Sequence, residues 1–87
     1  MGHKIFAIYD SKAGAYLPPW TSNNAATASR RFEASLENRE SDFARFPADY
    51  TLFQIGSWDE EFGVITMDEA PTNLGTALSY IKDETNA

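Results

Sequence analysis

Cationic and aromatic side chains are interleaved in the first half of the chain, in a pattern that suits single-stranded nucleic acid. Six of the 7 lysines and arginines lie within residues 4–45, with tyrosine, tryptophan and phenylalanine between them. Aromatic rings stack on bases while cationic groups contact phosphates, so this mixture favours single-strand binding. The candidate contact residues are Lys12, Tyr16, Trp20, Arg30, Arg31 and Arg39.

A structural explanation of the same residues stays open. Tyr16 and Trp20 can be core residues that close a sheet, and the arginines can pair with acidic neighbours on a solvated helix. The chain carries 13 acidic residues against 7 basic ones, a formal net charge of -6, which opposes the approach of a polyanion. We therefore expect any DNA binding to be weak, salt-sensitive and selective for single strands.

The remaining reactive residues do not form a catalytic or metal-binding pattern. The chain has no cysteine and a single histidine, His3, so neither a Cys–His pair nor a histidine-rich metal cluster can form. The acidic run at residues 59–61 is typical of a solvated hairpin tip and lacks the spacing of a calcium loop. The sequence predicts a protein without enzyme activity, metal or cofactor.

A small α+β domain is expected to position these residues. At 87 residues, 43% hydrophobic and 14% aromatic, the chain suits one folded domain over residues 1–87. Apolar alternation predicts strands over 3–9, 50–58 and 62–68, separated by a loop over 10–20 and later connections. Helices are predicted after a cap at Thr21 or Ser22 and after a cap at Thr72 or Asn73. The element order is then β-α-β-β-α.

Each predicted helix has one apolar stripe, so both helices should cover one face of a three-stranded sheet. The first stripe is Ala25, Ala28, Phe32 and Leu36, and the second is Leu74, Ala77, Leu78 and Ile81. The covered face should carry Phe6, Ile8, Phe53, Ile55, Ile65 and Met67.

The opposite face has too many large apolar groups to stay in contact with water. It would carry Ile5, Tyr9, Leu52, Trp58 and Val64. Three coverings are open: the loop over 10–20, a second copy of the chain, or stacked bases. We expect a homodimer that uses Tyr9, Leu52, Trp58 or Val64.

Three stretches of the chain resemble a known viral family. They are KIFAIYDSKAGAYLPPW at 4–20, DYTLFQIGSWD at 49–59 and APTNLG at 70–75. In this order they are similar to the small non-structural protein of gokushovirus-type microviruses, which are tailless phages with single-stranded DNA. The resemblance implies a protein made in the infected bacterium and assigned to genome replication, where it favours single-strand synthesis for packaging.

Two functions follow from the resemblance and the residue pattern. The first is a non-enzymatic accessory factor in viral single-stranded DNA replication, with single-stranded DNA, the phage replication initiator or host replication proteins as partners. The alternative is a homodimeric protein-interaction factor that acts on a phage or host replication or packaging protein without contacting DNA. No apolar run is long enough to span a membrane and the N-terminus lacks a secretion signal, so the expected location is the host bacterial cytoplasm.

Overall fold

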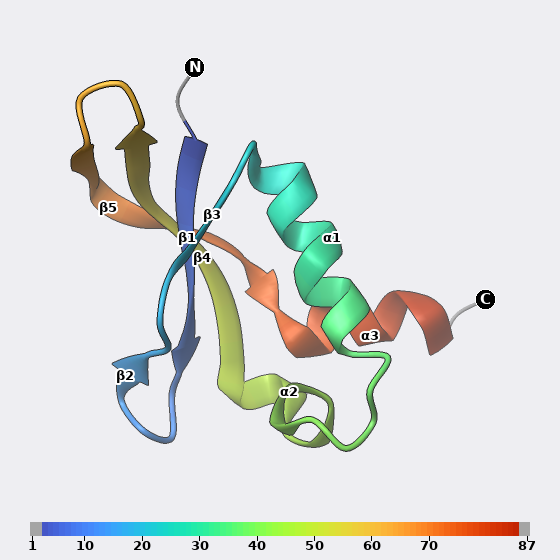
Figure 1. The fold of residues 1–87 in the computed structure, drawn as a ribbon. Coiled ribbons are helices and arrows are strands. Elements are labelled where there is room, and N and C mark those ends of the chain that lie inside the picture. The colour runs from blue at the N-terminus through green and yellow to red at the C-terminus, as the bar shows by residue number, and fades with distance from the viewer. Residues whose placement is uncertain (1–2, 86–87) are drawn as a thin grey trace.

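An antiparallel sheet forms one layer of the structure and helices form the other (Figure 1). The computed structural model describes residues 3–85, and the side chains of residues 3–81. Its elements are β1 (His3–Asp10), β2 (Ala15–Tyr16), β3 (Trp20–Ser22), α1 (Ala25–Ser35), α2 (Asp42–Arg45), a 3-10 turn η1 (Pro47–Asp49), β4 (Tyr50–Asp59), β5 (Val64–Thr76) and α3 (Ala77–Thr85). The α+β class is confirmed, whereas the expected three-stranded sheet is wrong because this sheet has five strands.

The two additional strands come from the segment that was predicted to be a loop. The sheet order is β2-β1-β4-β5, and β3 also pairs with β1. β2 and β3 therefore lie along one edge of β1, and the Leu17 amide donates to the Ile8 carbonyl between them (2.8 Å). Pro18 and Pro19 have no N–H to donate, so the ladder stops there and resumes at Trp20.

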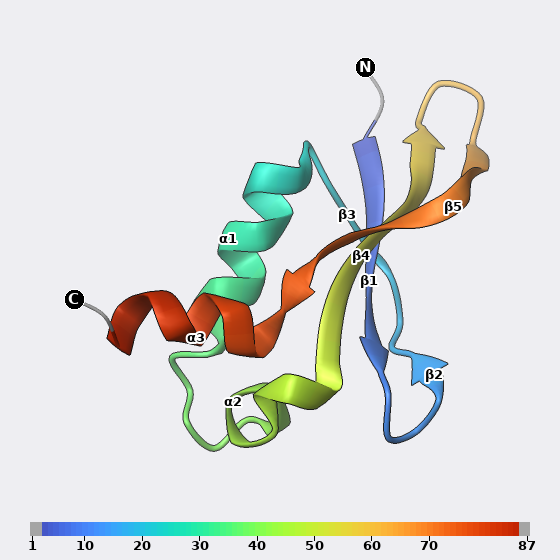
Figure 2. The same ribbon diagram turned by 180° about the vertical axis from the view of Figure 1, so that it is seen from behind.

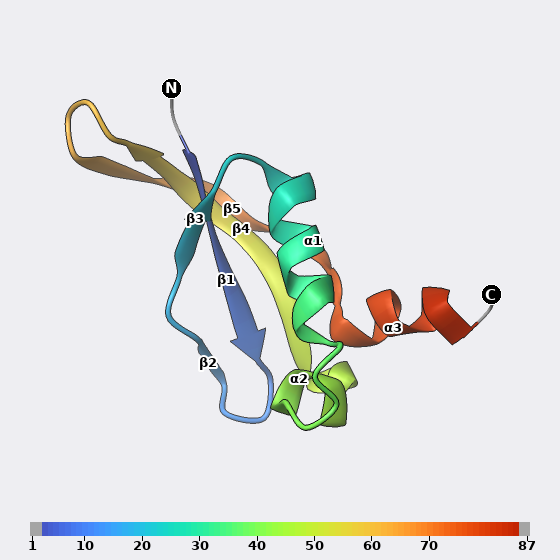
Figure 3. The ribbon, with the colours of Figure 1, turned by 45° about the vertical axis from the view of Figure 1, so that its right-hand side comes forward.

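α1 and α3 pack on the same face of the sheet, as predicted (Figure 3). Their buried residues join those of β1 and β4 in one core, made of Phe6, Ile8, Ala28, Phe32, Leu36, Tyr50, Leu52 and Ala77. None of the described helices is long and apolar enough to cross a lipid bilayer.

The stripe predicted for α1 is confirmed, but the helix boundaries differ from the prediction. Ala28, Phe32 and Leu36 are buried, which fixes the face that α1 presents to the sheet. Asn24 caps the helix by accepting from the Thr27 amide (2.8 Å). The expected caps at Thr21 or Ser22 are wrong because β3 contains both residues.

The C-terminal region differs more, because Pro71 does not end the strand. β5 lies at the sheet edge, and its pairing with β4 is irregular between Met67 and Thr72, so Pro71 interrupts no regular ladder. α3 starts only at Ala77, where the Thr76 hydroxyl oxygen accepts from the Ser79 amide (3.2 Å). Leu74, expected in the helix stripe, therefore belongs to the strand.

A bulge at Ile55 reverses the faces of β4 along its length. Phe6 pairs with Gln54 and Ile5 pairs with Gly56, so Ile55 is the extra residue. Successive side chains of a strand point to opposite faces. In β4, the even-numbered residues up to Gln54 therefore face the helices, and the even-numbered residues from Gly56 onward face the opposite side. Simple alternation therefore assigned Leu52 to the wrong face, and Leu52 is fully buried in the core.

Phe53, Ile65 and Met67 were expected under the helices and lie on the uncovered side instead. Phe53 pairs with Ala7, which alternates with the core residues of β1. Met67 pairs with Gly56, and Ile65 with Trp58, on that same side. Ile65 and Met67 are 60% and 61% exposed, so no helix covers them.

Candidate functional site

An apolar hollow lies between α1, α2 and the β1–β3 edge of the sheet. Its volume is about 300 Å³, and it is lined by Ile8, Trp20, Arg31, Phe32, Ser35 and Phe43. Its size is at the lower limit of small-molecule sites. A dry apolar cavity of about half that volume accommodates benzene in another protein, so one planar ring fits in the hollow.

An aromatic ring and a guanidinium, from Trp20 and Arg31, line this hollow. Trp20 is half-buried, packs 6.2 Å from the Phe6 ring centroid, and has a buried Nε1–H without a hydrogen-bond partner among residues 3–81. Arg31 is exposed and forms no ion pair, since the one ion pair among the described side chains joins His3 and Glu60. The hollow thus offers a ring surface and a guanidinium to one ligand, whereas the buried indole N–H of Trp20 is not accessible from it.

The structure brings together only two of the six predicted nucleic-acid contacts, Trp20 and Arg31. Arg30 is exposed on α1 and does not line the hollow, because neighbouring helical residues point about 100° apart. Arg39 is exposed in the turn that follows α1. Tyr16 contacts Tyr9 and Phe53 on the sheet face opposite the helices.

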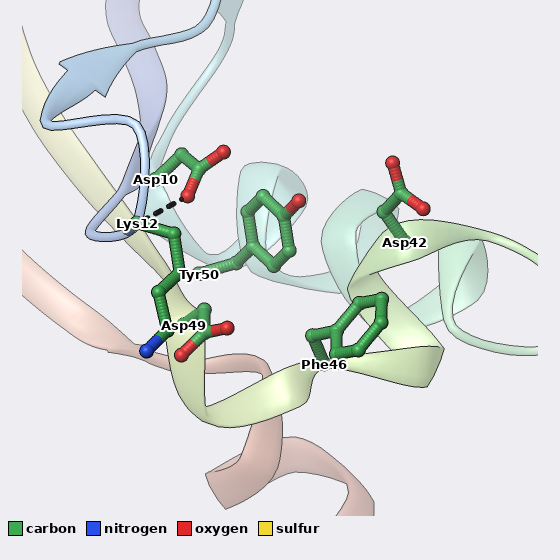
Figure 4. A pocket seen from close by; sticks show the side chains of 6 residues that line it. All are labelled: Asp10, Lys12, Asp42, Phe46, Asp49 and Tyr50. Atoms are coloured by element: carbon green, nitrogen blue, oxygen red, sulfur yellow. Dashed lines mark hydrogen bonds between the residues drawn. The ribbon is translucent and has the colours of Figure 1, made fainter.

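Lys12, the sixth predicted contact, lies in an acidic environment. It lines a second hollow of about 310 Å³ together with Asp10, Asp42 and Asp49 (Figure 4). Burial is the main cause of a raised pKa for Tyr50 there, and the charges of these three carboxylates add to it. The same charges repel a phosphate, so Lys12 is a poor DNA contact.

The second candidate surface is the sheet face that no helix covers, which we call the open face. Tyr9 and Tyr16 lie 4.9 Å apart between ring centroids, and Tyr16 lies 5.8 Å from Phe53. Tyr16 and Phe53 belong to the two strands that flank β1, so their rings meet across the small Ala7. The large apolar residues of the open face are Ile5, which is buried, and Tyr9, Tyr16, Phe53, Trp58, Ile65 and Met67.

The open face differs from the predicted dimer surface in two residues. Tyr9 and Trp58 lie on it as predicted, whereas Leu52 is buried in the core. Val64 pairs with Asp59 and faces the other side of the β4–β5 hairpin. The end of this hairpin lies away from all three helices (Figure 2).

The sequence pattern indicates neither the place of Phe43 in the hollow nor the side of the sheet on which Phe53 lies. Gly56 could have indicated the side of Phe53, because a lone glycine inside a strand often marks a bulge or a close backbone approach. A Cβ at Gly56 would lie 2.5 Å from the Thr66 carbonyl oxygen, so β5 approaches where only glycine fits.

These features define a small α+β protein with two apolar contact surfaces on opposite sides of one sheet. The sequence model of the Phage ORF5 protein family matches residues 3–80, and the chain belongs to that family. No curated protein and no solved structure matches the chain. The family makes this a phage protein, in agreement with the bacteriophage origin expected from the sequence.

Proposed function

We propose that this phage protein is a non-enzymatic accessory factor of viral single-stranded DNA replication that contacts single-stranded DNA weakly in the host bacterial cytoplasm. Its family membership supports a phage accessory role. The resemblance to the small non-structural protein of gokushovirus-type microviruses supports replication as the process.

The shared position of Trp20 and Arg31 carries the DNA-binding part of this proposal. An unstacked base enters the hollow against the rings of Trp20 and Phe43, and Arg31 contacts the adjoining phosphate. A paired base is stacked within its duplex and cannot enter, so the site selects single strands.

The charge of the protein sets the expected affinity. Stacking of one base contributes about 1–3 kcal/mol, and one arginine neutralises one phosphate. The net charge of -6 opposes these gains at long range. Binding is therefore weak and decreases steeply with salt, as expected for a protein that acts beside a stronger DNA-binding partner such as the replication initiator.

Fluorescence anisotropy of a labelled oligonucleotide tests the proposal at an ionic strength of about 0.01 M, where charge effects extend furthest. Arg31→Glu and Arg39→Glu change the net charge equally, but only Arg31 lines the hollow. We expect Arg31→Glu to remove measurable binding and Arg39→Glu to retain most of it. Equal binding by wild type and Arg31→Glu contradicts the proposal.

A protein-directed factor that never touches DNA is the second candidate function. The open face favours it, because large apolar side chains dominate that face and no lysine, arginine, aspartate or glutamate occupies a paired position there. In this case the protein acts on a phage or host replication or packaging protein. Loss of viral replication in an Arg31→Glu mutant phage separates the candidates, because the protein-directed factor does not need Arg31.

A further inference from the structure

We infer that a second copy of this chain covers the open face, so that two sheets stack with their helices outward. The inference rests on the second candidate function only in treating the open face as a docking surface, and it is independent of DNA binding in the hollow. The aromatic residues Tyr9, Tyr16 and Phe53 form one end of this interface, and Ile65 and Met67 form the other.

The charge distribution favours a second copy over nucleic acid. The paired positions of the open face carry no lysine or arginine that could contact a phosphate. His3 lies at the end of this face and already pairs with Glu60 through Nε2 and Oε1 (3.1 Å). The paired positions of the open face also carry no carboxylate, so they can meet their own copy without local repulsion. The exposed Glu69 lies between the paired positions Met67 and Asn73 of β5, and each chain carries a formal charge of -6.

The size of the open face is sufficient for a weak dimer. The face has four rows about 4.8 Å apart, formed by β1, β4, β5 and the edge that β2 and β3 make together. With about eight residues along each row, the footprint is roughly 500 Å² per copy. Two copies then bury about 1,000 Å², which is near the lower limit for a specific interface. Because affinity ranges down to micromolar even for larger interfaces, we expect a dimer that dissociates at micromolar concentration.

The shape of the face suits the same arrangement. A twisted sheet packs well on a second sheet of the same twist, at a separation of about 10 Å. A two-fold axis through the open face places identical residues in reciprocal contact, which closes the assembly as a dimer. The product has four layers, with each sheet covered on both sides, so the exposed Ile65 and Met67 become buried.

Sedimentation velocity over a concentration series tests the inference with three variants of the full chain. Ile65→Lys and Met67→Lys each place a charge on the open face. Val64→Lys is the matched control, because Val64 is the exposed neighbour on the other side of β5. All three side chains are at least 47% exposed, so the variants should fold, which circular dichroism verifies.

We expect wild type and Val64→Lys to shift from 9.7 kDa to twice that mass as concentration rises. Ile65→Lys and Met67→Lys should dissociate at least about tenfold more readily, because an unpaired charge is buried at the interface. A wild type that stays monomeric at every concentration, or open-face variants that dimerise like wild type, overturns the inference. Oligonucleotide binding by the monomeric variants keeps this result separate from the proposal about the hollow.

Discussion

The two faces of the sheet are built from the same strands, yet only one of them has a helical layer. On the covered face, Phe6 and Leu52 have no exposed surface and pack under α1 and α3. On the open face, Tyr16, Ile65 and Met67 keep about half or more of their surface exposed. The difference shows that apolar alternation marks strands well but does not say which side a helix will cover.

The open face is partly closed by its own side chains. Ala7 and Ile5 are 1% and 6% exposed although neither belongs to the helix-covered core. The Tyr16 and Phe53 rings meet across Ala7 because its methyl group leaves room for them. The surface that remains joins two apolar groups, Tyr9–Tyr16–Phe53 and Trp58–Ile65–Met67, with polar residues such as Thr51 and Asn73 on the same face.

Truncation of one residue on each face gives the largest expected contrast. Leu52→Ala should lower the free energy of unfolding by about 2–5 kcal/mol, because it leaves a cavity in the core. Ile65→Ala should change it by no more than about 0.5 kcal/mol in the monomer, because the side chain is largely exposed. Urea denaturation at low protein concentration measures both. Equal losses would mean that the two faces do not differ as described.

A substitution at Gly56, next to the bulge in β4, gives the second largest expected effect on stability. Gly56→Ala should cost about 1–3 kcal/mol, because its Cβ meets the Thr66 carbonyl oxygen at 2.5 Å and the backbone must move. Ser57→Ala in the same strand is the control and should stay close to wild type. A tolerated Gly56→Ala, measured by the same denaturation, would show that β4 and β5 do not approach so closely there.

Much of the covered face could be predicted from the sequence, because local spacing determines it. Ala28, Phe32 and Leu36 follow the helical period, and Phe6 and Ile8 occupy alternate positions of one strand. The faces of β4 could not be predicted by alternation, because the bulge depends on how β4 pairs with β1 and β5. A one-residue shift of that kind moves every later side chain to the other face.

The candidate site was predictable only in part, for the same reason. Two of the predicted contacts, Trp20 and Arg31, line one hollow, but the sequence pattern grouped them with Tyr16 and Lys12, which lie elsewhere. Sequence proximity in the segment before α1 was the basis for that grouping. Pairing of β2 and β3 along β1 separates Tyr16 from Trp20, because Tyr16 contacts the open face and Trp20 packs on the core.

Removal of a hydrogen bond that attaches α3 to the covered face gives a smaller expected loss of stability. The Tyr80 hydroxyl donates to the Leu74 carbonyl oxygen (2.8 Å) and lies 3.1 Å from Ser29 Oγ on α1. Tyr80→Phe keeps the ring, which packs against Phe32, and should cost about 0.5–1.5 kcal/mol. Tyr16→Phe on the open face is the control, and thermal unfolding compares the two. A larger loss of thermal stability for Tyr16→Phe than for Tyr80→Phe would mean that the open face, and not the covered face, contributes more to stability.

The smallest expected effect is a pH dependence at Tyr50. Burial, followed by the charges of Asp10, Asp42 and Asp49, raises the Tyr50 pKa above its ordinary value of 10.0. The unfolded chain therefore loses this proton at lower pH than the folded chain, and stability falls as pH rises above about 10. Tyr50→Phe should flatten part of that decline in urea denaturation at pH 9 to 11, a window around the ordinary tyrosine pKa. An unchanged slope would exclude Tyr50 as a cause.

The two tryptophans provide a direct test of the proposal that DNA binds at the hollow and a second copy of the chain binds at the open face. Trp20 lines the hollow and Trp58 lies on the open face. In the single-tryptophan variants Trp58→Phe and Trp20→Phe, emission is recorded during oligonucleotide titration and, separately, during dilution. We expect DNA to change the emission of Trp20 alone and dilution to change the emission of Trp58 alone. DNA-dependent change at Trp58 with none at Trp20 would contradict it.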